Sequence, residues 1–209
     1  MTEQAPAVFI VDDDASVRKA LQRLLASRGF RVETFADAEE YLTRGPLDGI
    51  GCLMLDLRMP GMGGIELQAE LKAKGCELPI VFLTGHGDLP SGVEAMKQGA
   101  VDFLQKPVDE TALFRALEQA LQRRRAALAE CGEVASARER LGLLTPRELE
   151  VVRCVLSGAR NKQIADHLGI AEKTVKLHRA RAMEKLAAGS AAELGRVCAQ
   201  LRLEPEACS

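Results

Sequence analysis

Acidic residues, a hydroxyl and an ammonium group follow short apolar runs in the first half of the sequence. Asp12 and Asp13 come directly after the run FIV, and Asp56 follows CLML. Thr84 comes after IVFL, and Lys106 lies just after VDFLQ. Neighbouring carboxylates repel one another unless a positive charge lies among them. Oxygen ligands without thiols suit a hard cation such as Mg2+, and a carboxylate beside such a cation can attack phosphorus to form an aspartyl phosphate.

Such a site requires a fold that brings distant segments together. Apolar runs at 8–11, 52–55, 80–83 and 101–104, with a weaker alternating run at 31–35, indicate five strands. The segments between them show the three- and four-residue spacing of amphipathic helices. This alternation predicts an α/β fold, a parallel sheet with helices on both faces. Because functional groups gather at the carboxyl ends of such strands, the polar residues above are expected to converge on one pocket.

Each acidic residue could instead cap a helix or a turn. Asp14 is expected to do so, because it directly precedes the first helical segment. Capping is a poor explanation for Asp12, Asp13 and Asp56 together, since all of them end up at the edge that also carries Lys106. The combination favours a shared cation and phosphoryl site.

The last part of the sequence is predicted to be entirely helical. The segment 145–148, TPRE, combines an N-cap, a proline at the first helical position and the glutamate of a capping box. That helix is expected to stop at Gly158. Three more helices are expected: one capped by Asn161 and ending at Gly169, one from 172 to about 187, and one capped by Ser190 and running to 201.

Residues 161–186, NKQIADHLGIAEKTVKLHRARAMEKL, have the spacing of a helix-turn-helix. The second helix carries Lys173, Lys176 and Arg181 on the face opposite its apolar residues. A helix that presents cations and small groups suits the major groove of DNA. Scattered Lys and Arg can also form no more than a solvated surface, so the charge balance of the region has to be considered as well.

The two halves of the chain differ in charge. Residues 1–122 carry a net charge of −7 and residues 123–209 a net charge of +5, which together make −2. This contrast predicts a domain at 1–122, a linker at 123–142 and a basic domain at 143–209 for which nucleic acid is a candidate partner. The linker is rich in Ala, Arg and Glu and is expected to be helical, with a break near Gly132, or a flexible coil, as the alternatives.

Composition argues against several classes of protein. No apolar run approaches the roughly 20 residues of a membrane helix, and the N-terminus MTEQAPA lacks the features of a signal peptide. A cytoplasmic location is therefore expected. The six cysteines form no CxxC pair and the three histidines add no ligand spacing, so neither a zinc site nor a disulfide framework is expected.

Residues 7–122 resemble a response-regulator receiver domain. The matching segments are VDD at 11–13, LDLRMPGMGGIEL at 55–67, LTGHGD at 83–88 and DFLQKP at 102–107. The resemblance implies a flavodoxin-like, doubly wound, five-stranded sheet of strand order 2-1-3-4-5. It also implies a cis peptide bond between Lys106 and Pro107.

The same resemblance implies roles for the acidic residues. Asp56 would accept a phosphoryl group from a phosphohistidine on a sensor kinase. Asp13 and Asp56 would bind Mg2+ together with the backbone carbonyl of Arg58, and Asp12 would assist. Lys106 would pair with the phosphoryl group.

Thr84 and Phe103 are expected, by resemblance, to form a switch pair in which the hydroxyl moves inward and the ring follows. Phe103 could also serve simply as a core residue. His86, in the loop after Thr84, is assigned no role and is expected to lie at the surface.

Residues 144–201 resemble an effector domain of the LuxR/FixJ/NarL type, with the FixJ branch closest. The resemblance rests on LTPRELEVVRCVLSG at 144–158 and on the NKQIADHLGIAEKTVKLH that follows. It implies a four-helix fold whose last helix is a dimer contact. Base contacts would come from Lys176, Leu177 and Ala180, although Ala180 is too short to hydrogen-bond a base. Phosphate contacts would come from Lys162, Thr174, Arg179 and Arg181.

Together these patterns predict a two-component response regulator that controls transcription, as an activator and with RNA polymerase as a further partner. Phosphorylation would shift an equilibrium towards a DNA-binding homodimer. The protein would not be an enzyme beyond taking up and losing its own phosphoryl group. The alternatives are a stand-alone phosphatase with an aspartyl intermediate and a phosphorylation-gated protein that binds protein or RNA.

Overall fold

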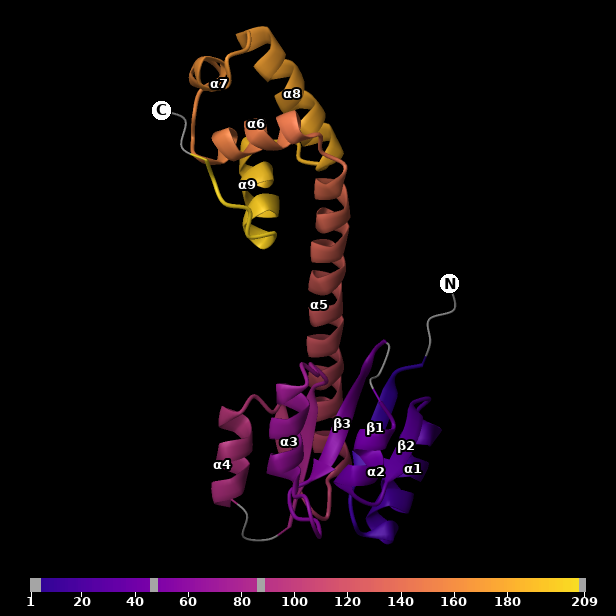
Figure 1. The fold of residues 1–209 in the computed structure, drawn as a ribbon. Coiled ribbons are helices and arrows are strands. Elements are labelled where there is room, and N and C mark those ends of the chain that lie inside the picture. Colours follow the sequence, from indigo (N-terminus) through magenta and orange to yellow (C-terminus); the bar gives the residue numbers. More distant parts are fainter. Residues whose placement is uncertain (1–4, 46–48, 86–88, 207–209) are drawn as a thin grey trace. The chain divides into compact units, whose positions relative to one another are not determined.

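Figure 1 shows the fold in a computed structural model, which describes residues 5–45, 49–85 and 89–206. The chain divides into two compact units, Met1–Leu128 and Ala129–Ser209, and each is described by itself. His86 lies outside the described residues, so its predicted surface position stays a prediction.

The first unit is built on a five-stranded parallel sheet. Its strands are β1 (Ala7–Val11), β2 (Arg31–Phe35), β3 (Gly51–Asp56), β4 (Ile80–Thr84) and β5 (Asp102–Gln105). They lie in the order β2-β1-β3-β4-β5, which confirms the predicted doubly wound topology. The helices between and after them are α1 (Ala15–Ser27), α2 (Ala38–Thr43), α3 (Gly64–Ala73), α4 (Leu89–Lys97) and α5 (Glu110–Gly142).

Alternate residues of the central strands point into two separate apolar cores. Phe9, Leu55 and Phe82 pack into the core on the side of α2 and α3. Ile10 and Leu83 pack into the core on the side of α1 and α5. Both faces of the sheet are therefore covered, which explains why these strands read as continuous apolar runs.

Local capping fixes where the chain leaves the sheet. The Asp14 carboxylate accepts hydrogen bonds from the backbone N–H groups of Ser16, at 2.7 Å, and Val17, at 3.4 Å. Asp14 is thus the N-cap of α1, as predicted.

The peptide bond between Lys106 and Pro107 is cis, which agrees with the expectation drawn from the family resemblance.

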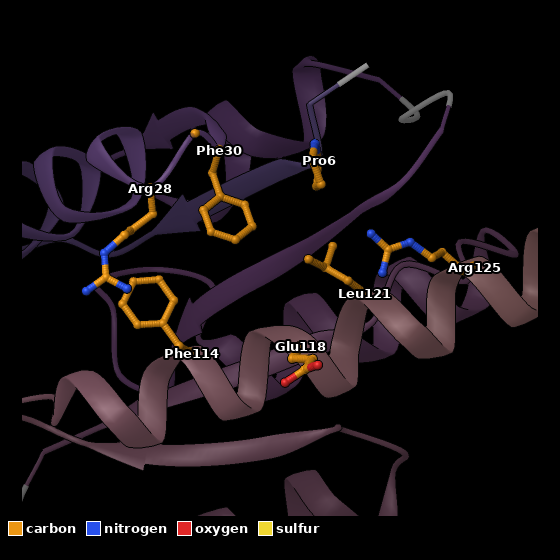
Figure 2. A pocket seen from close by; sticks show the side chains of 8 residues that line it. Pro6, Arg28, Phe30, Phe114, Glu118, Leu121 and Arg125 are labelled. Carbon is orange, nitrogen blue, oxygen red and sulfur yellow. The ribbon is translucent and has the colours of Figure 1, made fainter. Parts of the chain in front are cut away.

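A pocket of about 400 Å3 lies between α5 and the connection from α1 to β2 (Figure 2). Phe30 and Phe114 stack on one another in its wall, with ring centroids 6.4 Å apart. The guanidinium of Arg28 lies 4.4 Å from the centroid of the Phe114 ring. Because Phe30 directly precedes β2, this pocket is at the amino ends of the strands and is not part of the acidic site.

The helix α5 continues without interruption from Glu110 to Gly142. The linker is therefore helical, as predicted, but the break considered near Gly132 is absent. A single glycine costs a helix only about 1 kcal/mol. The Ala, Arg and Glu around Gly132 favour the helix enough to outweigh that cost.

The second unit contains four helices after α5: α6 (Pro146–Leu156), α7 (Asn161–Leu168), α8 (Glu172–Lys185) and α9 (Ala191–Gln200). Thr145 and Glu148 form the predicted capping box of α6, and Ser190 caps α9. Gly169 ends α7 in the left-handed conformation, with φ of 65°. All four helices thus begin and end close to the predicted positions.

One predicted cap was wrong. Arg160, and not Asn161, is the N-cap residue of α7. The backbone N–H of Arg160 donates a hydrogen bond to Oε1 of Gln163 at 2.9 Å. Asn161 lies inside the helix, where its side-chain oxygen accepts a hydrogen bond from Arg179 at 3.3 Å.

Within the described residues, no helix is both long and apolar enough to cross a membrane. Cys52, Cys76, Cys131 and Cys198 are free thiols. Cys154 is disulfide-bonded.

Candidate functional site

The parallel register brings the predicted site residues to one edge of the sheet. Val11 is aligned with Leu55, so Asp12 follows β1 at the level where Asp56 ends β3. Asp56 is in turn aligned with Leu83, one residue before Thr84. Thr84 is aligned with Gln105, so Lys106 comes directly after that level. The four side chains therefore converge because four different strands end together.

Three carboxylates meet in this pocket. Asp12, Asp13 and Asp56 each offer an oxygen, and these oxygens lie within 4.8 Å of one another. Asp12 is fully buried and Asp56 is 6% exposed, whereas Asp13 is exposed to solvent. Two buried carboxylates and one exposed carboxylate thus form an all-oxygen donor set, which is suited to Mg2+.

Lys106 supplies a positive charge among the carboxylates, as expected from their mutual repulsion. Its Nζ lies 2.7 Å from Oδ2 of Asp12 and 2.5 Å from Oδ2 of Asp56. Burial of this amine works to lower its pKa, but its contacts with the two carboxylates outweigh burial and the pKa of Lys106 is raised. Lys106 is therefore a firmly protonated cation that contacts both buried acids.

Asp12 retains unused capacity for a further ligand. Its Oδ1 accepts a hydrogen bond from the backbone N–H of Asp14 at 3.0 Å. Its Oδ2 is buried and, although Lys106 is close, accepts no well-aligned hydrogen bond among the described residues. A buried carboxylate oxygen left in this way is a ready ligand for a cation.

Two arginines border the pocket in different ways. The backbone N–H of Arg58 donates to Oδ1 of Asp56 at 3.2 Å, which fixes the rotation of that carboxylate. The Arg18 guanidinium donates to the backbone carbonyl of Asp12 at 2.5 Å. Arg18 was not predicted as a site residue, because the reach of a side chain from the first turn of α1 to the end of β1 leaves no mark in the sequence pattern.

The two residues of the predicted switch pair differ in exposure. Thr84 is 5% exposed at the end of β4, whereas Phe103 is 38% exposed on β5. The Phe103 ring lies beside Gly92 of α4, where an added Cβ would be 3.6 Å from the ring. The interpretation of Phe103 as a core residue was therefore wrong: β5 is an edge strand, and a glycine covers the ring incompletely.

The helix-turn-helix presents a mixed face on α8. Val175 and Ala182 are buried in the cores of the second unit. The opposite side of α8 is exposed, with three cations and two apolar side chains: Lys173, Lys176, Leu177, Ala180 and Arg181. Its cations could reach phosphates and its small side chains could approach base edges.

Not every predicted DNA contact is equally available. Lys162 is exposed, whereas Thr174 and Arg179 are half-buried. Arg179 hydrogen-bonds Asn161 of α7, so it connects the two helices of the motif. Lys176 is paired with Glu172 at 3.1 Å.

A partly buried ion pair, which was not predicted from the sequence, connects α8 to α6. Lys185 lies at the end of α8, and its Nζ is 2.7 Å from Oε2 of Glu148 on α6. It also donates to the backbone carbonyl of Leu143 at 3.1 Å. The hydrogen bond from Lys185, followed by those from Thr145, lowers the pKa of the buried Glu148 to about 2. The only hint in the sequence was Glu148 itself, which was assigned to the capping box alone.

Comparison with known proteins matches both units. Residues 8–118 match the family model described as response regulator receiver domain. Residues 142–198 match the family model described as bacterial regulatory proteins, luxR family.

Relatives match this chain over most of its length. The transcriptional regulatory protein FixJ of Azorhizobium caulinodans is 44% identical over 202 residues, covering 94% of this chain and 93% of the relative. Nodulation protein W of Bradyrhizobium diazoefficiens is 43% identical over 190 residues, covering 91% and 84% respectively.

Two solved structures are similar over nearly the whole chain. The response regulator StyR is 48% identical with a TM-score of 0.78, and the match covers 94% of this chain and 99% of StyR. Full-length FixJ from B. japonicum is 38% identical with a TM-score of 0.59, and the match covers 96% and 99%.

Proposed function

Because the chain belongs to the two-component response regulators of the FixJ/NarL type and is a phosphorylation-dependent transcriptional regulator, we propose that Asp56 is the residue that accepts the phosphoryl group. The observation that carries the proposal is the position of its carboxylate. One oxygen is 2.5 Å from Lys106 and the other accepts the N–H of Arg58. Asp56 is thus held in one orientation beside a cation, at the edge where a phosphodonor can enter.

The transfer needs little from the protein beyond positioning and charge. A carboxylate oxygen of Asp56 attacks the phosphorus of a phosphohistidine on a sensor kinase. The new O–P bond forms as the P–N bond breaks, and the electron pair of the P–N bond leaves with the imidazole nitrogen. Lys106, which contacts Asp56 before transfer, neutralises the negative charge of the phosphoryl oxygens afterwards.

Asp12, Asp13 and Asp56 would hold Mg2+, together with the backbone carbonyl of Arg58. The buried oxygen of Asp12 that lacks an aligned hydrogen bond supports this assignment, as does the all-oxygen donor set. When bound, Mg2+ would supply positive charge to the phosphoryl oxygens. Arg18 would keep the β1–α1 connection in place through the Asp12 carbonyl.

We propose that Thr84 and Phe103 convert phosphorylation into a change at the surface. Thr84 is buried. Its hydroxyl can donate a hydrogen bond to a new phosphoryl oxygen at the same sheet edge. Movement of Thr84 towards that oxygen would vacate space for the ring of Phe103, which rests on α4 beside Gly92. The face formed by α4, β5 and α5 would then pair with a second copy of the chain, and α9 would form the dimer contact of the second unit.

The proposed domains are a receiver domain at 1–122, a helical linker at 123–142 and a DNA-binding domain at 143–209. The last of these would bind promoter DNA. Base contacts would come from Lys176, Leu177 and Ala180, on the exposed face of α8. Phosphate contacts would come from Lys162, Thr174, Arg179 and Arg181. A sensor kinase, promoter DNA and RNA polymerase are the proposed partners, and the proposed location is the cytoplasm.

The phosphoacceptor assignment is tested by labelling with radioactive acetyl phosphate, with and without Mg2+. The wild type should become labelled only with Mg2+, and Asp56→Asn should not become labelled. Asp37→Asn is the matched control, because Asp37 also follows a strand but only caps α2, accepting the N–H of Glu40 at 2.8 Å. Equal labelling of wild type and Asp56→Asn would overturn the assignment.

DNA binding is tested separately with the full chain. Treatment with acetyl phosphate and Mg2+ should raise the affinity of the wild type for a selected duplex and leave that of Asp56→Asn unchanged. Affinity should fall steeply with salt, as expected when phosphates are neutralised. Binding to RNA or protein without binding to duplex DNA would support the interaction-protein alternative.

A further inference from the structure

A further cavity lies at the amino ends of the strands, on the side of the sheet covered by α2 and α3. It has a volume of about 380 Å3 and opens between the ends of these two helices and the residues that lead into β4. Gly45, in its wall, precedes β3, whereas Asp56 ends that strand. The cavity is therefore separated from the phosphoryl site by the length of a strand.

The walls of this cavity are mostly apolar. Five of the residues that line it belong to the core of the first unit or pack against that core: Tyr41, Leu42, Leu71, Cys76 and Leu78. Exposed residues, among them Gly45 and Glu77, border it, so a ligand can enter from solvent. An apolar cavity of about 150 Å3 is enough for benzene, so this one has room for a single ring with a substituent.

Tyr41 brings a polar group into this apolar wall. The residue is only 6% exposed. Its ring is held by Phe35, at 5.3 Å between ring centroids, and by Phe9, at 6.0 Å. These two contacts fix where the hydroxyl of Tyr41 lies.

The hydroxyl of Tyr41 makes no hydrogen bond to any of the described residues, although the hydroxyl of a buried tyrosine usually has a partner. It is also not among the enclosed polar atoms that lack a partner. The hydroxyl therefore opens into the cavity that Tyr41 lines.

A water molecule is a poor partner for this hydroxyl. Ordered waters in proteins typically make about three hydrogen bonds, but a water at this position would lie against leucine side chains. Burial raises the pKa of the Tyr41 hydroxyl, so at neutral pH it is an uncharged phenol that can both donate and accept. A ligand oxygen attached to an apolar body would satisfy the hydroxyl and cover the leucines at the same time.

The charged residues beside the cavity give little reason for a charged ligand. Lys74 is paired with Glu70 at 3.0 Å. The guanidinium of Arg124, which reaches the cavity from α5, donates to the backbone carbonyl of Gly49 at 3.1 Å. Glu77 is exposed at the border and would repel an anion. The cations are thus already engaged by the protein.

We propose that this cavity binds a small, uncharged and largely apolar molecule that carries one hydrogen-bonding oxygen, such as a cyclic alcohol or ketone. Tyr41 is the residue that binds the oxygen, and the leucines of the wall bind the apolar body. The proposal goes beyond the proposed function, because it gives the first unit a ligand site that is separate from phosphorylation.

The test uses cyclohexanol as the probe and the isotope-labelled full chain. In an NMR titration, we expect saturable shifts of the amide signals around the cavity, including those of Gly45 and Gly75. Cyclohexanecarboxylate and cyclohexylammonium have the same ring but carry a charge, and both should bind more weakly. Tyr41 is the only tyrosine and the chain has no tryptophan, so a change in protein fluorescence with cyclohexanol reports on this side chain directly.

The variant Tyr41→Phe removes the hydroxyl and keeps the ring. It should fold, and be labelled by acetyl phosphate, like the wild type. It should bind cyclohexanol about five-fold more weakly, as expected for the loss of one hydrogen bond between uncharged groups. Thr43→Val is the matched control, because Thr43 is also on α2 but its hydroxyl donates to the backbone carbonyl of Glu40 at 2.7 Å. This control should bind cyclohexanol like the wild type.

Three outcomes would overturn the proposal. Cyclohexanol may produce no saturable shift around the cavity, cyclohexanecarboxylate may bind more tightly than cyclohexanol, or Tyr41→Phe may bind cyclohexanol as well as the wild type does. The labelling of Asp56 tests the proposed function separately, and its result does not affect the cyclohexanol titration.

Discussion

The side chain of Asp12 is fully buried, and burial raises the pKa of its carboxyl although Lys106 and the N–H of Asp14 act in the opposite direction. A raised carboxyl pKa means that the ionised form is less favourable in the fold than in the unfolded chain. At neutral pH the charge of Asp12 therefore lowers the free energy of unfolding. A fold selected for stability alone would not keep this carboxylate, whereas a cation site requires it.

We expect Asp12→Asn to raise the free energy of unfolding of the first unit at neutral pH without Mg2+, because burial disfavours the ionised carboxylate. The gain should be complete above the raised pKa of folded Asp12, shrink as the pH falls through that pKa, and vanish below the unfolded value of 3.8. Urea unfolding followed by circular dichroism over a range of pH measures it. Added Mg2+ should stabilise the wild type and not the variant.

Asp13→Asn is the control for this prediction, because Asp13 is exposed and its replacement changes charge without changing burial. It should alter stability less than Asp12→Asn when Mg2+ is absent. An Asp12→Asn variant that is less stable than the wild type at neutral pH would contradict the role assigned to burial.

Single residues of the pocket were predictable where backbone topology alone places them. Asp12, Asp56, Thr84 and Lys106 each end or follow a strand, so the parallel sheet was sufficient to bring them together. The contact of Arg18 depends instead on the reach of a flexible side chain, which strand and helix periodicity cannot specify.

At the level of elements, the orientation of α8 depends on a charge pair at its last turn. Glu148 is buried and accepts hydrogen bonds from Lys185 and from the backbone of Thr145. One carboxylate thus caps α6 and ties α8 to it. The low pKa of Glu148, about 2, shows how strongly these partners favour its ionised form.

We expect Lys185→Met to lower the free energy of unfolding of the second unit by about 2 kcal/mol, because Glu148 then stays buried without its cation. Since folding depresses the pKa of Glu148 from 4.5 to about 2, the stabilisation is complete above pH 4.5 and is lost as the pH falls towards 2. The difference between variant and wild type should follow that window in thermal unfolding curves. Lys173→Met, exposed on the same helix, should have almost no effect.

Element boundaries were predictable where the local sequence decides them. The strands β1, β3 and β4 are buried on both faces, so their apolar runs were unambiguous. Thr145 and Ser190 cap by their own side chains, as their residue types predict. The cap of α7 was mispredicted because Asn161 is the better capping type in isolation, and its contact with Arg179 comes from the tertiary structure.

The uninterrupted α5 leads to a prediction at Gly132. An added Cβ there meets no atom within 4 Å and the backbone is helical, so Gly132→Ala should stabilise the helix by up to about 1 kcal/mol. Gly75→Ala is the contrasting control: it also has open space, but its φ of 71° strains an alanine and should cost about 1 kcal/mol. Thermal unfolding of both variants tests this, and a less stable Gly132→Ala would show that α5 is not a continuous helix in solution.

At the level of the whole molecule, signalling has to connect the acidic pocket with the DNA-binding unit. Within the described residues of the first unit, the exposed large hydrophobic side chains are Val93, Met96 and Phe103, all on α4 or β5. Phe103 also contacts α4 beside Gly92. The proposed switch residue therefore belongs to the apolar surface that would bury itself in a dimer.

Met96→Asp should consequently separate phosphorylation from dimerisation. A charge at the centre of an apolar interface is costly to desolvate, so we expect the variant to become labelled by acetyl phosphate as fast as the wild type while sedimenting as a monomer. Its affinity for the selected duplex should fall at least ten-fold, since two linked DNA-binding units hold a two-fold site far better than one. Lys19→Asp, an exposed position on α1, is the control and should dimerise normally. A labelled Met96→Asp that still dimerises would mean that phosphorylation acts through another surface.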